Sequence, residues 1–456
     1  MGETRDLLRL TAEISADFVE GLDDRPVLPE VDLESLRAAL TRDLPDAPTD
    51  ARAVISELAA NSDAGIAAMA GGRWFGFVLG GSVPAALAAD WLTSAWDQNA
   101  GLFAPTPAAA IVEEVAGGWL RELLGVPTAA SFGFVTGCQM AHVTALAAAR
   151  LHVLHERGWD VGDDGLYGAP PIRVVVGATR HVTVDRALRL LGMGAPDIIG
   201  ADDQGRMRVE ELEVDERPTI VSTQIGDVNT GACDDVSAIV ERTRTSGAWL
   251  HVDGAFGLWA AASPSLRHLV AGCEHADSWA TDAHKWLNVP YDCGIAFCAH
   301  PESHRAAMGT TAAYLVQGDG EGNREPLDYN PEFSRRARGF PVYAAIRALG
   351  RTGIAAMIER SCAHARRFAA GLEELGAEVL NEVVLNQVLF RFEDDERTAD
   401  VLRAVQASGE AWMSGTVWSG RAAIRVSVSN WQTTDEDVER TLAAYRAAVS
   451  GQAAAR

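Results

Sequence analysis

The sequence predicts an α/β protein with a mostly parallel central sheet in a large domain, a smaller C-terminal α+β domain and an N-terminal helical arm. Three observations favour this architecture. Short β-rich runs alternate with helical runs from Ser131 to Ala299, an amphipathic helix opens the chain, and two further β-like runs follow a long helical stretch near the end. Apolar strands joined by helices are typical of a sheet covered on both faces. We place the arm at residues 1–75, the large domain at 76–335 and the small domain at 336–456.

The opening segment has the spacing of an amphipathic helix. Apolar side chains recur near helical intervals between Leu7 and Leu22, and a Pro-rich connector follows between Pro26 and Pro48. Such an apolar stripe must be buried somewhere, and a partner subunit would serve as well as the chain's own core. The segment therefore reads as an arm and not as a compact domain.

The large domain is expected to alternate strands and helices. The expected strands are SFGFV, IRVVVGA, PTIVST, AWLHVD and GIAFCA, and the helices between the first four are AHVTALAAARLHVLHE, VDRALRLLG and VSAIVERTR. In sheets of this kind the sites lie at the carboxyl ends of the strands. Chemistry-bearing residues are therefore sought just after each run.

A Gly-rich stretch separates this region from the small domain. It runs from Met308 to Phe333 and has the composition of a mobile loop or lid. Helical patterns in YAAIRALG and AAMIERSCAHARRFAAGLEELG follow, and then the β-like runs VLNQVLFRFE and AAIRVSVSN. This order is typical of a smaller α+β domain.

Composition narrows the classes of partner. The 456 residues are 48% apolar and 22% charged, as in globular proteins, and the 39 basic and 63 acidic residues give a formal charge of −24. This charge argues against nucleic acid and anionic membranes as partners. No apolar stretch approaches the roughly 20 residues that cross a bilayer, and the N-terminus lacks the apolar centre of a signal peptide. We therefore expect a cytoplasmic protein.

The cysteines have no pattern of their own. They form no CxxC pair and stand near no His cluster at metal spacing, so we expect reduced, mostly buried thiols and no bound metal. They are Cys138, Cys233, Cys273, Cys293, Cys298 and Cys362.

Two segments carry the most informative polar residues. WLHVDGAFG and DSWATDAHKWL each include the end of a probable strand, so Asp253 and Lys285 could reach the same edge of the sheet. A lysine that forms a Schiff base must be partly desolvated, and a pyridine nitrogen needs a carboxylate to stay protonated. The pair meets both needs, which predicts a pyridoxal 5′-phosphate site.

The surrounding motifs resemble those of the group II pyridoxal-phosphate-dependent amino acid decarboxylases. This fold-type-I family, which is aspartate aminotransferase-like, includes aromatic amino acid, glutamate and cysteine-sulfinate decarboxylases. Its HVDAAxxG and NxHKW patterns stand here as HVDGA at 251–255 and DAHKW at 282–286, and the resemblance spans roughly residues 70 to 440. It implies an α-decarboxylase, a carboxy-lyase of amino acid metabolism, that is homodimeric with its active site at the subunit boundary.

The resemblance also assigns roles to single residues. It implies that Lys285 is the Schiff-base lysine, Asp253 the partner of the pyridinium nitrogen, Ala255 a ring-packing residue and His284 a phosphate-side ligand. Asp282 occupies a position that is often Asn in the family, which leaves its contact with the phosphate open.

Two upstream motifs supply further cofactor ligands by resemblance. HVTVDRA is similar to HxSVxRA, which makes His181 the imidazole that stacks on the cofactor ring. FVTGCQMAH stands where relatives carry a TSGGTEAN-like turn, and the first N–H groups of the helix that follows can cradle a phosphate. The phosphate candidates in this turn are Thr136, Gly137, Cys138 and Gln139.

Some of these roles have a purely structural alternative. Asp253 could cap a following helix, because Asp is a favoured N-cap residue. His181 could be a helix-start histidine, and His284 could lie one shell away from the phosphate. Neither composition nor spacing decides whether these three residues have structural roles or bind the cofactor.

The choice of reaction rests on Tyr314. By resemblance it stands where family decarboxylases keep a lid tyrosine that reprotonates the substrate carbon, whereas relatives that form aldehydes usually have phenylalanine there. Together with His181, it favours simple decarboxylation. An aldehyde synthase or a C–C lyase on the same scaffold is the alternative, and a non-catalytic scaffold ranks last because both Lys285 and Asp253 are present.

The substrate side chain is left open by the sequence. By the family's layout the pocket draws on five residues, whose mixed character slightly favours an aromatic amino acid and leaves an acidic one possible. These residues are Trp74, Phe77, Leu79, Asn99 and Phe103.

Overall fold

The computed structural model describes residues 2–310 and 323–451, which divide into two compact units. The first unit comprises Met1–Leu79, Arg367–Val379 and Leu389–Arg456, and the second comprises Gly80–Arg366 and Leu380–Val388. Each unit is described by itself below. The three predicted domain boundaries stay a prediction.

The second unit is built on a seven-stranded sheet with the strand order β1-β7-β6-β5-β4-β2-β3. β7 pairs antiparallel with both β1 and β6, and every other pairing is parallel, so six strands share one direction. The predicted α/β class with a mostly parallel sheet is confirmed. The strands are β1 (Ser131–Val135), β2 (Arg173–Gly177), β3 (Asp197–Ile199), β4 (Thr219–Gln224), β5 (Trp249–Asp253), β6 (Ser278–Asp282) and β7 (Gly294–Cys298).

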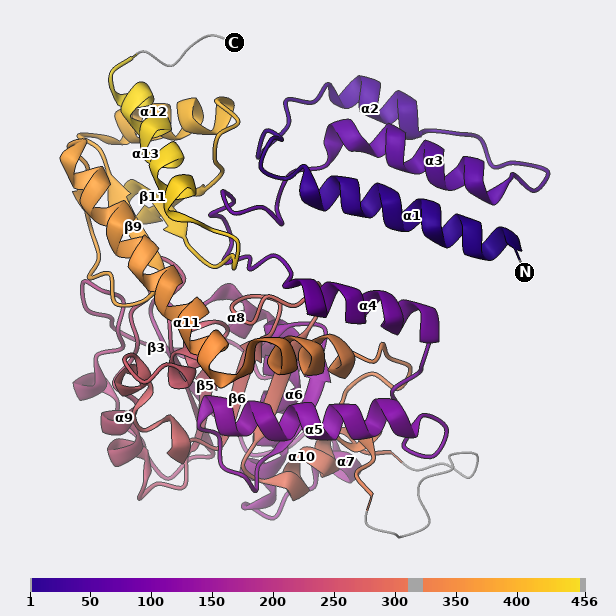
Figure 1. Cartoon of the computed structure of the whole chain (residues 1–456). Coiled ribbons are helices and arrows are strands. Elements are labelled where there is room, and N and C mark those ends of the chain that lie inside the picture. The colour runs from indigo at the N-terminus through magenta and orange to yellow at the C-terminus, as the bar shows by residue number, and fades with distance from the viewer. Residues whose placement is uncertain (1, 311–322, 452–456) are drawn as a thin grey trace. The chain divides into compact units, whose positions relative to one another are not determined.

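Figure 1 shows the helices of this unit. They are α4 (Pro84–Trp96), α5 (Pro107–Leu124), α6 (Cys138–His155), α7 (Val161–Asp164), α8 (Val182–Leu190), α9 (Val236–Thr243), α10 (Pro301–Met308) and α11 (Gly339–Glu374). α11 contains one non-helical residue, Gly350, at φ 61° and ψ 175°, and runs on into the first unit. Short 3₁₀ turns stand at 209–211, 257–262, 267–270, 273–275 and 326–329.

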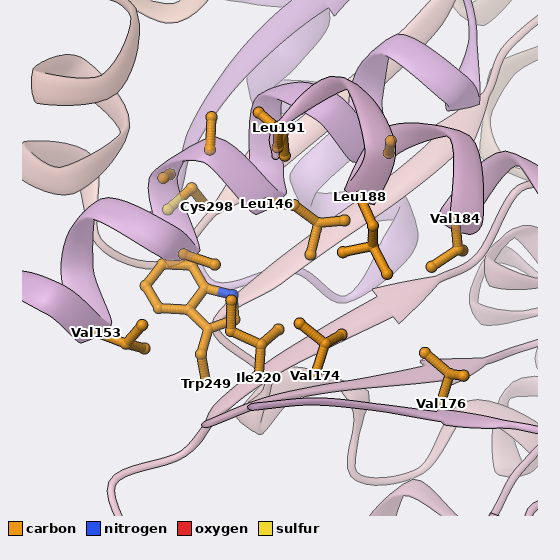
Figure 2. Close-up of a cluster of buried hydrophobic side chains, with 14 residues drawn as sticks. Leu146, Val153, Val174, Val176, Val184, Leu188, Leu191, Ile220, Trp249 and Cys298 are labelled. Carbon is orange, nitrogen blue, oxygen red and sulfur yellow. The ribbon is translucent and has the colours of Figure 1, made fainter. Parts of the chain in front are cut away.

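The core of this unit explains why the central strands β4, β5 and β6 are buried along their whole length. α6 lies across one face of the sheet and contacts β1, β4, β5, β6 and β7, and α8 and α10 contact α6. Figure 2 shows Leu146 of α6 and Leu188 of α8 above Val174, Ile220 and Trp249 of the strands. A fully buried leucine contributes about 1.5–3 kcal/mol through the hydrophobic effect. The carboxylates Asp253 and Asp282 are the last residues of β5 and β6, where the strands leave this core.

The first unit contains the N-terminal helices and a small sheet. α1 (Gly2–Glu20), α2 (Leu33–Leu40) and α3 (Ala51–Ser62) pack together, and a 3₁₀ turn follows at 63–65 (Figure 1). The sheet has the order β10-β11-β9-β8, and α12 contacts β10, β11 and α13. The remaining bounds are β8 (Glu378–Val379), β9 (Gln387–Arg391), α12 (Asp395–Ala407), β10 (Ser414–Trp418), β11 (Arg421–Ser427) and α13 (Asp435–Val449).

The thiols and the helices bear on two further expectations. All six cysteines are free; Cys233 is partly buried and the other five are buried. Burial is the first cause that raises the pKa of every one of these thiols, to about 12 for Cys298 and Cys362. Within residues 2–310 and 323–451, we find no helix with the length and apolarity to span a membrane.

Candidate active site

The candidate residues gather at one edge of the central sheet. Asp253 ends β5, Asp282 ends β6, and Thr136 and Gly137 follow the end of β1. Gly294 of β7 pairs with Val135 on one side and with Asp282 on the other, which brings these strand ends side by side. Carboxyl ends of parallel strands meet at one edge, which is where such sheets bind ligands.

Lys285 lies in the turn after β6 and is the only lysine among the 456 residues. Its Nζ stands 3.1 Å from Asp282 Oδ2, and its side chain is 19% exposed. Burial works to lower the pKa of this amine, but the facing carboxylate of Asp282, with Cys138 and Asp253, raises the pKa overall. The cofactor-free site therefore holds Lys285 as a protonated amine in an ion pair.

Asp282 Oδ1 has two further contacts. The backbone N–H of Cys138 donates to its Oδ1 at 2.6 Å, and His284 Nε2 lies 3.4 Å from the same oxygen. His284 Nδ1 accepts the N–H of Cys293 at 3.1 Å, so the ring proton resides on Nε2 and faces Asp282. Burial lowers the pKa of His284, which keeps the ring neutral. The ring of Tyr291 stacks on it with centroids 4.3 Å apart.

The turn between β1 and α6 is shaped by glycine. Gly137 is extended and precedes α6 without a side-chain cap, which leaves the first N–H groups of the helix to other acceptors. A Cβ on Gly137 would meet His284 Cε1 at 3.3 Å, and one on Gly294 would meet Gly137 Cα at 2.5 Å. The other phosphate candidates, Thr136 and Gln139, are partly buried, and Gln139 Oε1 accepts from Arg186 Nη1 at 3.3 Å.

Asp253 is buried among hydrogen-bond donors. The N–H of Ala255 donates to Oδ1 at 3.1 Å, the Cys138 thiol stands 3.9 Å from Oδ1, and His142 Nε2 lies 3.5 Å from Oδ2. Burial alone would raise the pKa of this carboxyl, but His142 first, then His181 and Lys285, lower the pKa well below its usual range. The residue is a carboxylate. Its bond to Ala255 forms a turn, and the next helical segment begins only at Gly257, so Asp253 caps no helix.

His181 combines a structural contact with a place near Asp253. It is the N-cap of α8, where its Nδ1 accepts the Thr183 N–H at 3.4 Å and lies 2.8 Å from Thr183 Oγ1. His181 is therefore a helix-start residue, as the structural alternative predicts. Capping uses Nδ1 and does not exclude a stacking role for the ring.

Part of the predicted set is not brought together by the described residues. Tyr314 lies outside them. Trp74, Phe77 and Leu79 belong to the first unit, where Trp74 stacks on Trp412 with centroids 4.3 Å apart and Phe77 is 53% exposed.

The last two pocket residues belong to the second unit. Asn99 Oδ1 accepts the N–H of Arg335 at 3.1 Å, and the N–H of Phe103 donates to Glu325 Oε2 at 2.9 Å. Both therefore hold the segment that follows residue 322. The grouping of all five residues into one substrate pocket stays a prediction.

One group beside the site escaped the sequence reasoning. His142 lies four residues after Cys138 on α6, so that both side chains face Asp253. This i, i+4 spacing was visible in CQMAH and could have placed both residues on one helix face. Without a known partner strand, nothing in the sequence said what that face would meet.

Comparison with known proteins decides the family. The model of the pyridoxal-dependent decarboxylase conserved domain matches residues 34–393, which is more than three quarters of the chain. The chain belongs to the pyridoxal-dependent decarboxylase family. Its predicted enzyme class, carboxy-lyase, and its predicted cofactor, pyridoxal phosphate, are thereby confirmed, as is the resemblance to group II decarboxylases.

Relatives of this decarboxylase span its whole length. It is 26% identical to an aromatic-L-amino-acid decarboxylase of Bacillus atrophaeus over 96% of this chain and 93% of the relative. It is 23% identical to a phenylacetaldehyde synthase of Arabidopsis thaliana over 96% and 94%. The crystal structure of Oryza sativa TDC with PLP and tryptamine matches 100% of this chain and 99% of the other at a TM-score of 0.92 and 22% identity, which shows a shared fold.

The residues of this decarboxylase fit its cofactor. An amine for the aldehyde, a buried carboxylate for the ring nitrogen and an uncapped helix N-terminus for the phosphate lie at neighbouring strand ends. Asp282 fits less well. It brings a negative charge to a position where a residue that binds the phosphate would be neutral or positively charged.

Proposed function

We propose that this decarboxylase removes the α-carboxyl group of an aromatic L-amino acid as carbon dioxide. The observation that carries the site is the position of Lys285. The only ε-amine of the chain stands at the end of β6, one strand away from the buried carboxylate of Asp253. The aromatic preference is supported by the name of the Bacillus relative and by the aromatic side chains among the pocket candidates.

The proposed roles follow from the chemistry of each side chain. Lys285 would hold the aldehyde carbon of the cofactor, and Asp253 would pair with the ring nitrogen. His284 and the N–H groups at the start of α6, around Gly137 and Cys138, would hold the phosphate. When bound, pyridoxal phosphate supplies an electron sink next to the substrate Cα.

Proton transfer falls to the chain itself. Lys285 is held protonated by Asp282, so it must give up a proton before its nitrogen can bond to carbon, and Asp282 is the base within reach at 3.1 Å. To His181 we assign stacking on the ring and orientation of the substrate carboxylate. We assign reprotonation of Cα to Tyr314, and ring packing to Ala255.

The test of this function has two parts. The first is to load the chain with pyridoxal phosphate, reduce it with borohydride and map the adduct by mass spectrometry. We expect the adduct on Lys285 and none in Lys285→Ala, which has no ε-amine left. An unmodified wild-type Lys285 would refute the assignment.

The second part is to measure carbon dioxide, amine, aldehyde and peroxide separately with tryptophan, tyrosine, phenylalanine and glutamate. We expect equal amounts of carbon dioxide and amine from the aromatic substrates. Aldehyde and peroxide in equal amounts would instead favour the synthase alternative, which the name of the Arabidopsis relative supports.

We also propose that the protein is a cytoplasmic homodimer. Exposed tryptophans on α4, Trp91 and Trp96, are large apolar groups of the kind that a partner subunit covers. Six free thiols fit a reducing compartment. Cell fractionation tests the location, and light scattering tests the dimer.

A further inference from the structure

A chain of four buried side chains leads from the core to Asp253. Trp249 Nε1 lies 2.8 Å from Ser278 Oγ, Ser278 Oγ lies 2.9 Å from His251 Nδ1, and His251 Nε2 lies 2.9 Å from His142 Nδ1. His142 Nε2 then faces Asp253 Oδ2 at 3.5 Å. Both imidazole side chains are fully buried, so their protons have no access to solvent.

The first link fixes the direction of the hydrogen bonds. An indole N–H can only donate, so Trp249 takes one lone pair of Ser278 Oγ. Within the described residues, Ser278 Oγ has only Trp249 and His251 as partners, so its proton must go to His251 Nδ1. Any other direction would leave a buried hydroxyl donor unsatisfied.

The same argument decides which nitrogen carries the proton in each of the two imidazole rings. Because His251 Nδ1 accepts, the proton of this ring is on Nε2 and is donated to His142 Nδ1. His142 in turn carries its proton on Nε2, which faces both the Asp253 carboxylate at 3.5 Å and the Cys138 sulfur at 3.5 Å. Burial, followed by the neighbouring His142, lowers the pKa of His251 to about 3, so this ring stays neutral and cannot reverse the order.

Asp253 therefore meets donors on both of its oxygens. His142 faces Oδ2, while Ala255 N–H and the Cys138 thiol face Oδ1. We propose that His142 is a positioning residue that keeps Asp253 ionised and fixed in place, so that Asp253 holds the proton on the ring nitrogen of the bound cofactor. The inference rests on the proposed role of Asp253.

A metal ion is the competing interpretation of the same group. Cys138, His142 and Asp253 offer ligand atoms within 4.8 Å of one another. A metal needs a thiolate and an imidazole lone pair. Burial, with Asp253 and Asp282, raises the pKa of the Cys138 thiol well above its usual range, and the directed chain puts a proton on His142 Nε2. Hydrogen bonding accounts for the cluster without a metal.

The test compares pyridoxal phosphate with its 1-deaza analogue, in which carbon replaces the ring nitrogen. Both compounds have the same aldehyde and phosphate, so a general defect in the site weakens both equally. The ratio of the two dissociation constants, measured on the full chain freed of cofactor by quenching of tryptophan fluorescence, isolates the ring-nitrogen contact. The variants are His142→Leu, which removes the donor, and His142→Gln, which can still place an N–H near Asp253.

We expect the wild type to bind pyridoxal phosphate more tightly than the 1-deaza analogue. In His142→Leu the ratio of the two dissociation constants should move about tenfold towards one, as expected for the loss of a hydrogen bond to a charged group. His142→Gln should keep most of it. Ser278→Ala removes the hydroxyl that keeps the proton of His251 on Nε2, although Ser278 does not contact Asp253. This variant should therefore shift the ratio in the same direction as His142→Leu.

An unchanged ratio in His142→Leu or in Ser278→Ala would overturn the inference, as would a His142→Gln ratio as low as that of His142→Leu. A wild-type chain that binds neither compound would overturn the proposed function itself. A wild-type chain that binds both compounds equally would remove only the role of Asp253 and His142.

Discussion

Asp282 pairs with Lys285 and also accepts the first N–H of α6, which is one of the groups proposed to bind the phosphate. A carboxylate that competes with a phosphate for the same N–H group also repels it, and a repulsion of about 1.4 kcal/mol changes the affinity about tenfold. We predict that Asp282→Asn binds pyridoxal phosphate about tenfold more tightly than the wild type.

The measurement is a fluorescence titration of the cofactor-free chain. Asp277→Asn is the matched control, because Asp277 precedes the other end of β6 and also pairs with a histidine, His300, at 2.7 Å. Its affinity should equal that of the wild type. Weaker binding by Asp282→Asn would show that the carboxylate assists the cofactor instead of opposing it.

His304 on α10 gives a pH prediction. Its side chain is buried, and burial, followed by Arg324, lowers its pKa to about 3. The unfolded chain binds a proton near pH 6.5 whereas the folded chain does not, so the stability is present above pH 6.5 and is lost as the pH falls towards 3.

For this one group the loss between pH 6.5 and 5 is about 2 kcal/mol. We predict that His304→Gln, which cannot be charged, reduces the fall in unfolding free energy over this interval by about that amount. Urea unfolding at both pH values measures it. Parallel curves for the two proteins would contradict the pKa assigned to His304.

At the residue scale, the sequence was most informative where a polar side chain ends an apolar strand. Asp253 and Lys285 could be chosen because their neighbours are buried β residues. His142 could not, since its meaning depends on which strand α6 crosses. The hydrogen bond that Asp282 accepts from Cys138 N–H likewise depends on an atom far away in the chain.

At the scale of the elements, β7 can begin only with a glycine. Its first residue, Gly294, lies against Gly137 and the start of α6, and a Cβ there would stand 2.4–2.5 Å from the Gly137 backbone. We predict that Gly294→Ala destabilises the fold by about 1–3 kcal/mol, because the backbones must separate.

Gly118 on α5 is the matched control, since a Cβ there meets nothing within 4 Å. Gly118→Ala should stabilise the fold by about 0.5–1 kcal/mol, as expected inside a helix. Denaturant unfolding distinguishes the two. Equal midpoints for both variants would rule out the close approach of β7 to α6.

The elements that the sequence predicts well are those that bury both faces. The predicted strands SFGFV and AWLHVD correspond to β1 and β5, which are both wholly buried. β3 and β10 were missed because they are short or half-exposed and carry no continuous apolar run. Strand direction was also out of reach for β7, because an apolar run looks the same in either orientation.

For the whole molecule, the exposed apolar groups on α4 predict association. Trp91 and Trp96 are 44% and 48% exposed. We predict that the wild type has twice the mass of one chain in light scattering and that Trp91→Glu moves the mass towards that of one chain. Tyr167→Glu is the control: Tyr167 is 98% exposed but follows α7 and does not belong to α4, so the same change there should leave the mass unchanged. A wild-type monomer would contradict the proposed dimer.

The single ε-amine of Lys285 has a practical consequence for handling the enzyme. Reagents directed at amines, such as N-hydroxysuccinimide esters on a solid support, find only that nitrogen and the α-amine of the chain. Once the cofactor shields Lys285, attachment occurs at one point, and every immobilised molecule is tethered in the same way. A catalyst bed made from this chain would be uniform without any engineering of its surface.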